Sequence, residues 1–358
     1  MRPRLKRTIE VLHSSAGDIY LLRPGGDGDL VIERPDDTTR ALLGALDGVS
    51  TSRELELRFG RSTVASALDS LHEWGVLEDA SVDEFLSPAE RARYDRQLRY
   101  FGDLAAPDLT AADYHRRLAT SRVALLGLGG LGSWAAYGLA SCGVGELVLV
   151  DGDVVEPSNF NRQILYRERD VGRAKAAVAA EALAAFNSTT SLQPVEQRLE
   201  CTAEIEAVVC GCDFVVNAAD WPAHDIERWV NAACFRLGLP SITMSHAPPV
   251  ARVGPLYVPG ETGCYVCQER SYRDSYPLFD EIVEQRRGKP SPAATLGPVC
   301  AFVGGQVALE VLHFLTGLCR PATLGAAHIY DLRTMAITRE SVPRSLGCSV
   351  CSVPSRAA

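Results

Sequence analysis

The chain has very little lysine and no cluster of positive charge. Only three of its 36 basic residues are lysine, and its 358 residues have a net charge of −9. Proteins that bind nucleic acid contact phosphates through clustered lysine or arginine side chains. The sequence therefore predicts no nucleic-acid partner.

A typical secretion signal and a typical membrane span are also lacking. The basic start, Met1–Arg7, runs into Glu10 without the apolar stretch of a signal peptide. Residues 123–150 have Glu146 as their only charge, but their seven glycines divide them into strand, turn, helix and strand rather than one long helix. The 11 cysteines of this long chain do not indicate a secreted disulfide framework. We therefore expect a cytoplasmic protein with no membrane partner.

The pattern of expected strands and helices changes near residue 82. Residues 1–82 contain a Gly/Asp turn at 24–28, short strands at 9–12, 19–22 and 30–32, and then short helices at 38–46, 52–59 and 62–74. This order predicts a winged-helix-like domain. Residues 83–358, which begin with a helix capped by Ser87, are expected to form a second domain.

From Arg122 onward, strands alternate with helices, which is typical of a doubly wound, mainly parallel Rossmann-like sheet. The expected strands are 122–126, 146–150, 191–196, 213–217 and 240–243, and the helices are 131–141, 173–186, 203–209 and 222–237. Beyond residue 250 we expect short strands, a polar stretch at 270–292, an apolar helix at 298–315 and strands near 327–331 and 335–340. The predicted fold class is α/β.

A glycine-rich turn follows the first of these strands. Its glycines are Gly127, Gly129, Gly130 and Gly132. Such a turn lets the backbone approach a phosphate, and the helix that it opens supplies free N–H groups and a positive dipole end. Asp151 ends the next strand, where an acidic side chain can bind ribose hydroxyls. These features predict a nucleotide site without distinguishing a dinucleotide from ATP.

Two cationic residues, Arg162 and Lys175, follow on a loop and on the next helix. The polyanionic triphosphate of ATP needs fixed cations for its cleavage, whereas a nicotinamide ring gains little from them. A lysine is unusual in a chain with 33 arginines, and its compact ammonium group suits a phosphate. ATP is therefore favoured. A solvated surface pair and an NAD-dependent oxidoreductase are the alternatives.

Five motifs occur in order along the chain. They are Arg93–Gln97, Gly127–Gly132, Asp151–Gln163 with its Ser-Asn-x-x-Arg-Gln core, Lys175 and Asn217–Asp220. Together they resemble the ThiF/MoeB family, the bacterial relatives of ubiquitin-activating enzymes, over about residues 88–352. The resemblance implies an enzyme in which a carboxylate attacks the α-phosphate of ATP and gives an acyl-adenylate and pyrophosphate.

The same resemblance assigns roles to individual residues. Those that would contact ATP are Asp151 at the ribose and Asn159, Arg162 and Lys175 at the phosphates. Asp220 would bind Mg²⁺, a hard ion that prefers carboxylate and phosphate oxygens. The alternative for Asp220 is a helix N-cap ahead of Trp221 and Pro222. Arg96 would reach the ATP of the other subunit, so a homodimer is expected.

Two Cys-x-x-Cys pairs, Cys264 with Cys267 and Cys348 with Cys351, lie far apart in the sequence. Each pair places two thiolates on one side of a tight turn, and two such turns complete a tetrahedral Zn²⁺ site. A redox dithiol is the alternative, but it would not be expected twice in such similar turns. A structural zinc site is therefore predicted, and the family resemblance supports it.

A cysteine is missing where sulfur-transferring members of the family have one. In those relatives, a cysteine in the crossover segment before the Gly-Pro-Val helix receives the acyl group or sulfur. Residues 268–298 contain none, and Lys289–Pro292 stands near that place. We therefore expect no thioester or persulfide step there, and a nucleophile that the substrate itself supplies.

The N-terminal region resembles PqqD-like domains, which bind leader peptides of ribosomally made natural products. The strand Leu30–Glu33 and the helix Ser62–Trp74 would form the groove for the leader. With 10 basic and 14 acidic residues, the first 80 residues do not favour the alternative of a DNA-binding winged helix. A peptide-recognition domain joined to an adenylating domain is similar to peptide-maturation enzymes of the MccB/PaaA type.

The predicted function is adenylation of a carboxyl group on a ribosomally made precursor peptide. The enzyme would be a homodimer that binds the peptide through its leader and uses ATP, Mg²⁺ and Zn²⁺. One alternative is adenylation of a sulfur-carrier protein. Another is a non-catalytic leader-binding scaffold for a separate cyclodehydratase, which should have lost Arg162, Lys175 or Asp220, although all three are present.

Overall fold

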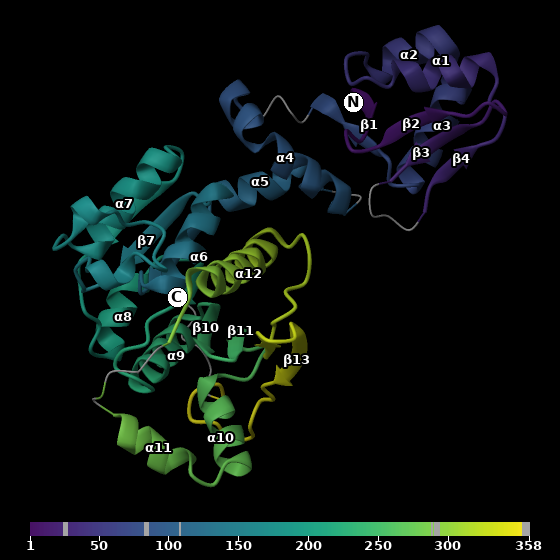
Figure 1. The fold of residues 1–358 in the computed structure, drawn as a ribbon. Helices are drawn as coiled ribbons and strands as arrows, with labels where there is room; N and C mark the ends of the chain where they lie inside the picture. The colour runs from purple at the N-terminus through teal and green to yellow at the C-terminus, as the bar shows by residue number, and fades with distance from the viewer. Residues whose placement is uncertain (24–27, 82–85, 107–108, 288, 290–293, 353–358) are drawn as a thin grey trace. The chain divides into compact units, whose positions relative to one another are not determined.

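The computed structural model describes residues 1–23, 28–81, 86–106, 109–287, 289 and 294–352 (Figure 1). Contacts between Cα atoms divide the chain into two units, Met1–Arg116 and Arg117–Ala358. Three predicted features lie wholly or mostly outside the described residues: the domain boundary at 82/83, the turn at 24–28 and the crossover stretch Lys289–Pro292. The boundary therefore stays a prediction.

The first unit contains a three-stranded antiparallel sheet with the order β2-β3-β4. Its strands are β2 (Glu10–His13), β3 (Ile19–Leu22) and β4 (Leu30–Ile32). The three predicted helices follow as α1 (Asp37–Ala45), α2 (Ser52–Phe59) and α3 (Arg61–Glu73). Sheet and helices share a core whose most buried side chains include Ile19, Leu21, Leu42, Leu55 and Val64.

Two further strands and two helices complete this part of the chain. β1 (Pro3–Leu5) pairs antiparallel with β5 (Leu77–Asp79), a pairing that the sequence did not predict. The helices are α4 (Pro88–Leu104) and α5 (Ala111–Ala119). Ser87 caps α4 as predicted: its hydroxyl accepts the Glu90 N–H at 3.2 Å, and its own N–H donates to the Glu90 carboxylate at 2.9 Å.

The second unit is built on an eight-stranded sheet with the order β13-β12-β11-β10-β9-β6-β7-β8. Its strands are β6 (Arg122–Leu126), β7 (Glu146–Val150), β8 (Ser191–Val195), β9 (Phe214–Asn217), β10 (Ser241–Ala247), β11 (Val250–Tyr257), β12 (Ala326–Asp331) and β13 (Ala336–Ser341). Strands β10, β9, β6, β7 and β8 run parallel, and β11, β12 and β13 add on antiparallel. The mixed, mainly parallel α/β sheet confirms the predicted fold class.

Strands β9, β6 and β7 lie inside the sheet and are buried, whereas the parallel strand β8 forms its edge and is largely exposed. In β6 and β7 the last four residues of each strand are buried, as expected for strands covered by helices on both sides. The helices between these strands are α6 (Gly130–Ser141), α7 (Lys175–Phe186), α8 (Thr202–Val209) and α9 (Asp225–Leu237). The segment 123–150 is thus strand, helix and strand, as the sequence predicted.

The long apolar helix α12 (Gly297–Thr316) packs against α6. Gly304 allows this close contact, because a Cβ at this position would lie 2.7 Å from the Cβ of Trp134 on α6. Within the part of the chain that the structure describes, α12 is the one helix long and apolar enough to cross a membrane, and half of it is buried inside the protein.

The predicted polar stretch at 270–292 instead contains most of α10 (Tyr265–Ser275) and all of α11 (Phe279–Arg286). Both helices are rich in polar side chains, so their sequence has no clear apolar stripe. Contacts from elsewhere in the chain hold α10: Arg228 on α9 pairs with the buried Glu269 at 2.9 Å, and Asn231 accepts the Tyr265 N–H at 2.8 Å. Tertiary contacts therefore decide the structure of this segment.

Candidate active site

A cavity of about 670 Å³ lies at the carboxyl ends of β6, β7 and β9. Ligands of open α/β sheets bind at this edge. Most of the predicted site residues line it: Gly127, Gly129, Gly130, Asp151, Asn159, Arg162, Lys175 and Asp220. Gly132 and Arg96 are not among the lining residues.

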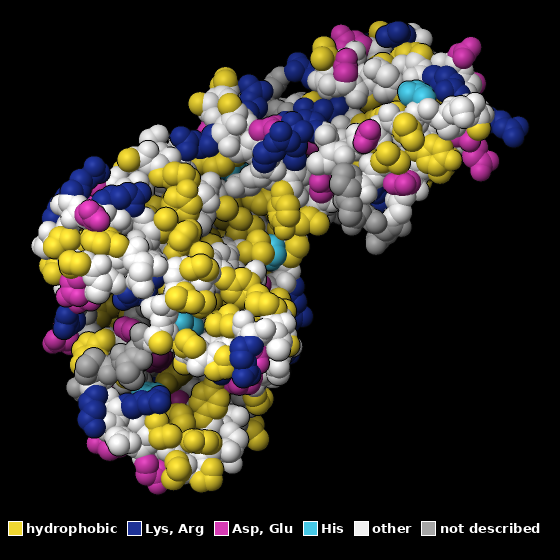
Figure 2. Space-filling model, viewed as in Figure 1, with side chains coloured by type: hydrophobic (Ala, Val, Ile, Leu, Met, Phe, Trp, Pro, Cys, Tyr) yellow, Lys and Arg dark blue, Asp and Glu magenta, His cyan; other side chains and the backbone are white. Residues whose placement is uncertain are grey.

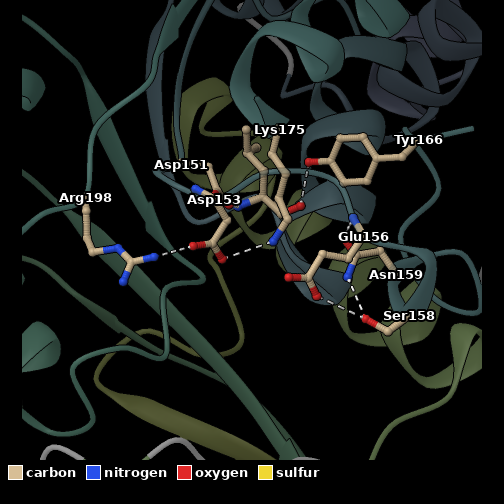
Figure 3. A network of polar contacts seen from close by, with 9 residues as sticks. Asp151, Asp153, Glu156, Ser158, Asn159, Tyr166, Lys175 and Arg198 are labelled. Carbon is tan, nitrogen blue, oxygen red and sulfur yellow. Dashed lines mark hydrogen bonds and ion pairs between the residues drawn. The ribbon is translucent and has the colours of Figure 1, made fainter. Parts of the chain in front are cut away.

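The glycine-rich turn leads from β6 into α6 with very little space around its backbone. Gly127 has a φ of +87°, and a Cβ there would lie 2.8 Å from the backbone nitrogen of Ala219. A Cβ on Gly132 would lie 2.0 Å from the Gly127 carbonyl oxygen. Gly132 therefore lets α6 start close to the turn. The buried hydroxyl of Tyr166 donates to the Leu128 carbonyl at 2.8 Å and holds the turn (Figure 3).

Asp151 is fixed by two backbone groups at the end of β7. Its carboxylate accepts the Leu128 N–H at 2.7 Å and the Asp153 N–H at 2.8 Å. Burial raises the pKa of this carboxyl group, while the nearby charge of Lys175 and the two N–H groups oppose that rise. A carboxylate held in this way can accept hydrogen bonds from ribose hydroxyls in the cavity.

Asp153, which the sequence interpretation did not assign, joins two cations at the cavity (Figure 3). Its carboxylate contacts the Lys175 ammonium at 3.1 Å and the Arg198 guanidinium at 2.7 Å. Although burial acts the other way, the charges of these two cations lower the pKa of Asp153. The Lys175 side chain is only 9% exposed, so it is not the solvated surface residue that was the alternative.

Asn159 and Arg162 belong to the loop after β7, which contains the short 3₁₀ helix η2 (Pro157–Asn159). The buried Asn159 accepts the Glu156 N–H at 3.0 Å, which fixes the loop. The Arg162 guanidinium donates to the Ser158 carbonyl at 2.7 Å. The backbone carbonyl of Arg162 accepts the Trp134 ring N–H at 3.0 Å. These bonds place an arginine on the cavity wall beside the start of α6.

Asp220 is exposed and reaches the cavity from the segment after β9. The N-cap of α9 is His224, so Asp220 is not the cap ahead of Trp221 that was its alternative role. An exposed carboxylate beside a candidate phosphate site suits a hard cation such as Mg²⁺. Arg96 lies on α4 in the first unit, with 87% of its side chain exposed. Its role at a partner's ATP stays a prediction.

Several cavity residues had no role assigned from the sequence. Asp153, Glu156, Ser158 and Gln163 belong to the Asp151–Gln163 motif, whereas Gln197, Arg198, His246, Thr295 and Cys300 lie outside the motifs. Residues 197–199 follow β8, and His246 lies near the end of β10. The rule that parallel strands end at one edge applies to β8 and β10, but it does not indicate which residues reach the cavity, because that depends on the order of the strands in the sheet.

The four cysteines of the two Cys-x-x-Cys pairs meet in one buried cluster. Their sulfur atoms all lie within 4.8 Å of one another. Sulfur–sulfur distances are 3.6 Å between Cys264 and Cys348 and 3.5 Å between Cys267 and Cys351. Tetrahedral Zn²⁺ with bonds of about 2.3 Å requires sulfur atoms about 3.8 Å apart. The cluster therefore fits a four-cysteine metal site, and all eleven cysteines are free of disulfides.

Comparison with known proteins identifies relatives over most of the chain. The ThiF family matches residues 94–350. The ThiS sulfur-carrier adenylyltransferase of Escherichia coli is 35% identical over 254 residues, which are 71% of this chain and 94% of that protein. The molybdopterin-synthase adenylyltransferase of E. coli is 32% identical and matches 74% of this chain and 98% of its own length.

Solved structures similar to this one extend over almost the whole chain. E. coli MccB with AMPCPP and the peptide MccA is 25% identical, with a TM-score of 0.74, and the match covers 98% of this chain and 99% of that one. The same enzyme has been solved with a succinimide. PaaA is 28% identical, with a TM-score of 0.74, and the match covers 94% of this chain and 99% of that one.

Proposed function

Because this chain belongs to the ThiF family and is an adenylyltransferase of the ThiF/MoeB type, we propose that it adenylates a carboxyl group on a ribosomally made precursor peptide. The main support is the extent of the matches. The ThiS and molybdopterin-synthase adenylyltransferases of E. coli match 71% and 74% of this chain and are themselves matched over 94% and 98% of their length. MccB, solved with the peptide MccA, matches 98%. The part of this chain that the two E. coli adenylyltransferases leave unmatched therefore has a counterpart in MccB, an enzyme solved with a peptide.

The first unit offers a surface suited to an extended peptide. Strand β4 pairs with β3 on one side and, within the described residues, with no strand on the other. Leu30 and Ile32 on β4 pack against the same core as Leu68 on α3, so the groove proposed for the leader would lie between this strand and this helix. A leader could add to β4 through backbone hydrogen bonds and place side chains against α3. Tethering the leader raises the effective concentration of the reacting carboxyl group.

The cavity of the second unit would supply what adenylation requires. A carboxylate is a weak nucleophile, and the phosphate chain repels it. Arg162 and Lys175 would neutralise and orient the phosphates, and Asp151 would hold the ribose. Asp220 would bind Mg²⁺, which supplies further charge neutralisation on phosphate oxygens. Free N–H groups at the start of α6 would face a phosphate.

The substrate itself would supply the nucleophile that consumes the acyl-adenylate. Residues 268–298 contain no cysteine that could take the acyl group. MccB has been solved with a succinimide, a ring in which one nitrogen is bonded to two acyl carbons. An amide or amine nitrogen of the peptide could form such a bond by attacking the activated carboxyl group. AMP would be the leaving group.

A homodimer with sites completed by the partner's Arg96 is part of this proposal. Large apolar side chains stay exposed on the second unit, including Leu296, Leu309, Met335 and Ile337. Figure 2 shows hydrophobic side chains gathered over α12. A second copy that covers such a surface would remove it from water.

The four-cysteine cluster would hold Zn²⁺ as a structural ion. The cluster joins the start of α10 to the last described turn of the chain, at Cys348 and Cys351. The cluster packs against Phe235 on α9 and Tyr257 on β11, and none of its four cysteines lines the cavity. Zinc would therefore stabilise the fold rather than take part in the reaction.

Peptide-dependent pyrophosphate release tests the proposed function. Synthetic peptides from the short reading frames next to the gene would be incubated with enzyme, ATP and Mg²⁺. At least one should stimulate release of pyrophosphate from ATP. That peptide should gain the mass of an adenylyl group while the adenylate persists, or lose the mass of one water once an internal nitrogen has displaced AMP. A Gly-Gly-ending sulfur-carrier protein is the competing substrate, favoured by the 35% identity to the ThiS adenylyltransferase. Activity with that protein alone would replace the peptide proposal.

Two matched variants test the groove in the full chain. Val31 on β4 is 42% exposed, and Leu57 on α2 is 82% exposed. Val31→Asp places a charge beside the strand edge that would bind the leader, and should raise the peptide KM about tenfold or more, which corresponds to about 1.4 kcal/mol. Leu57→Asp should leave the peptide KM unchanged. Equal KM values for both variants would contradict a leader site at β4.

A further inference from the structure

Arg198 is a cavity-lining arginine that lies outside the sequence motifs and has no role in the chemistry described above. It follows β8, the strand that pairs with β7. The two backbones are close together here, because a Cβ on Gly152 would lie 2.6 Å from the Arg198 nitrogen. The Arg198 side chain therefore extends from a position directly beside the turn that follows Asp151.

Arg198 and Lys175 bind one carboxylate from opposite sides (Figure 3). The Oδ1 atom of Asp153 contacts the Arg198 guanidinium at 2.7 Å, and its Oδ2 atom contacts the Lys175 ammonium at 3.1 Å. The backbone makes a second link, since the Lys175 N–H donates to the Asp153 carbonyl at 3.0 Å. Asp153 therefore determines where the ammonium group of Lys175 lies in the cavity.

The two cations differ in their exposure to solvent. The Lys175 side chain is 9% exposed, and that of Arg198 is 56% exposed. A nearly buried ammonium group requires a nearby opposite charge, which the Asp153 carboxylate provides. Water can solvate the exposed guanidinium without any carboxylate. The contact between Arg198 and Asp153 therefore matters for the charge of the carboxylate rather than for the stability of the arginine.

A phosphate bound by Lys175 would lie close to Asp153. An ammonium group has three N–H donors, so one that donates to a carboxylate can donate to phosphate oxygens as well. Two acceptors that each lie about 3 Å from one nitrogen are at most about 6 Å apart. Negative charges at that separation near a protein surface repel each other enough to weaken binding by about tenfold.

The charges of this group cancel only when Arg198 is included. The carboxylates of Asp151 and Asp153 contribute two negative charges, and Lys175, whose charge acts on both, contributes one positive charge. Arg198 brings the sum to zero. Without Arg198 the group would present a net negative charge to a triphosphate.

We propose that Arg198 neutralises Asp153 so that Lys175 can bind phosphate oxygens of ATP. Asp153 positions the ammonium group, and Arg198 cancels the repulsion that the same carboxylate would exert on the triphosphate. Arg198 is thus a positioning residue that acts through Asp153 and does not contact the nucleotide. The inference rests on the proposed function, because it requires ATP in the cavity, and it adds a residue to that site.

A double-mutant cycle in the full chain tests the inference. The probe is AMPCPP with Mg²⁺, because the methylene bridge between the α- and β-phosphates of AMPCPP prevents release of pyrophosphate. Calorimetry measures its Kd. Arg198→Gln removes the positive charge and should raise this Kd about tenfold. In an Asp153→Asn background, where the repelling charge is gone, the same substitution should change the Kd by less than about threefold.

Arg236→Gln is the matched control. The Arg236 side chain is 58% exposed and contacts Glu206 at 2.7 Å, and neither residue of this pair lines the cavity. Exposure and contact distance are thus nearly those of Arg198. This variant should bind AMPCPP with the wild-type Kd. Asp153→Ser repeats the cycle with a smaller neutral side chain.

Three results would contradict these expectations. A wild-type Kd in Arg198→Gln would overturn the inference. So would an equal rise in Kd with and without the Asp153 carboxylate, because Arg198 would then contact the nucleotide directly. If the wild-type protein does not bind AMPCPP with Mg²⁺ at all, the proposed function itself fails, and with it the role assigned to Arg198.

Discussion

Asp220 differs from Asp153, another acidic residue of the cavity, because no arginine or lysine is bonded to it among the described contacts. Asp153, by contrast, has two cationic partners. An exposed carboxylate without a protein cation suits an incoming metal ion. This difference distinguishes the candidate metal ligand from a structural ion pair at the scale of single residues.

Asp220→Asn keeps the size of the side chain and removes its charge. We expect peptide-dependent pyrophosphate release to fall at least about 100-fold, because the variant loses a metal ligand close to the phosphates. Leader binding, measured by fluorescence anisotropy of a labelled peptide, should not change. Asp225→Asn is the control, since Asp225 is outside the cavity and faces Arg287 at 3.7 Å. Unchanged turnover in Asp220→Asn would refute the metal role.

The glycines and Asp151 could be predicted because their environment is local. The tight connection between one strand and the following helix predicts Gly127 and Gly132. The end of the next strand predicts Asp151. His246 and Arg198 could not be predicted in this way. They approach the cavity only because β10 and β8 take particular places in the sheet, which the strand order decides and the local sequence does not.

At the scale of helices and strands, α10 shows how distant contacts shape a polar segment. Its first turn contributes Cys267 to the cysteine cluster, and Glu269 is bonded to α9 through Arg228. A second set of bonds joins Tyr272 to Glu340 on β13 at 2.8 Å, and Glu340 to Arg252 on β11 at 3.0 Å. Contacts with the cysteine cluster, with α9 and with β13 therefore hold α10. Sequence periodicity could not predict it, because none of these bonds is local.

Cys351→Ser tests whether the cluster is a structural metal site. The variant should lose about one equivalent of zinc and have a Tm lower by on the order of 10 °C, since 1 kcal/mol corresponds to about 2–4 °C in a chain of this size. Zinc content is measured by mass spectrometry and Tm by calorimetry. Cys319→Ser, at a half-buried cysteine outside the cluster, should change neither. Full zinc content in Cys351→Ser would contradict a four-cysteine site.

At the scale of the whole molecule, the proposal requires two subunits for one reaction site. Arg96 is almost fully exposed and has only a loose contact with Asp95 at 3.9 Å. Its chemistry, a planar cation with five donors, suits a phosphate or a carboxylate of a ligand. The described residues of its own unit do not engage it strongly, which is consistent with a partner's ATP as its target.

Mixed dimers can test this arrangement. Arg96→Ala and Asp220→Asn should each be inactive alone. When the two are mixed and allowed to exchange subunits, half of the dimers contain one of each, and each of these has one intact site. Activity should therefore recover to about one quarter of the wild-type value. Light scattering of each variant confirms the dimer. No recovery after proven exchange would place Arg96 at the site of its own subunit.

The sheet of the first unit has a practical consequence for work with fragments. β2 and β4 each pair with β3 and, within the described residues, have no other strand beside them. A fragment limited to this unit would expose the unpaired backbone groups of two edge strands. At the protein concentrations used for crystallisation, copies would pair edge to edge and form extended sheets. A leader peptide fused so that it pairs with β4 would cover that edge. Only the β2 edge would then stay free, so association would stop at dimers of the fragment.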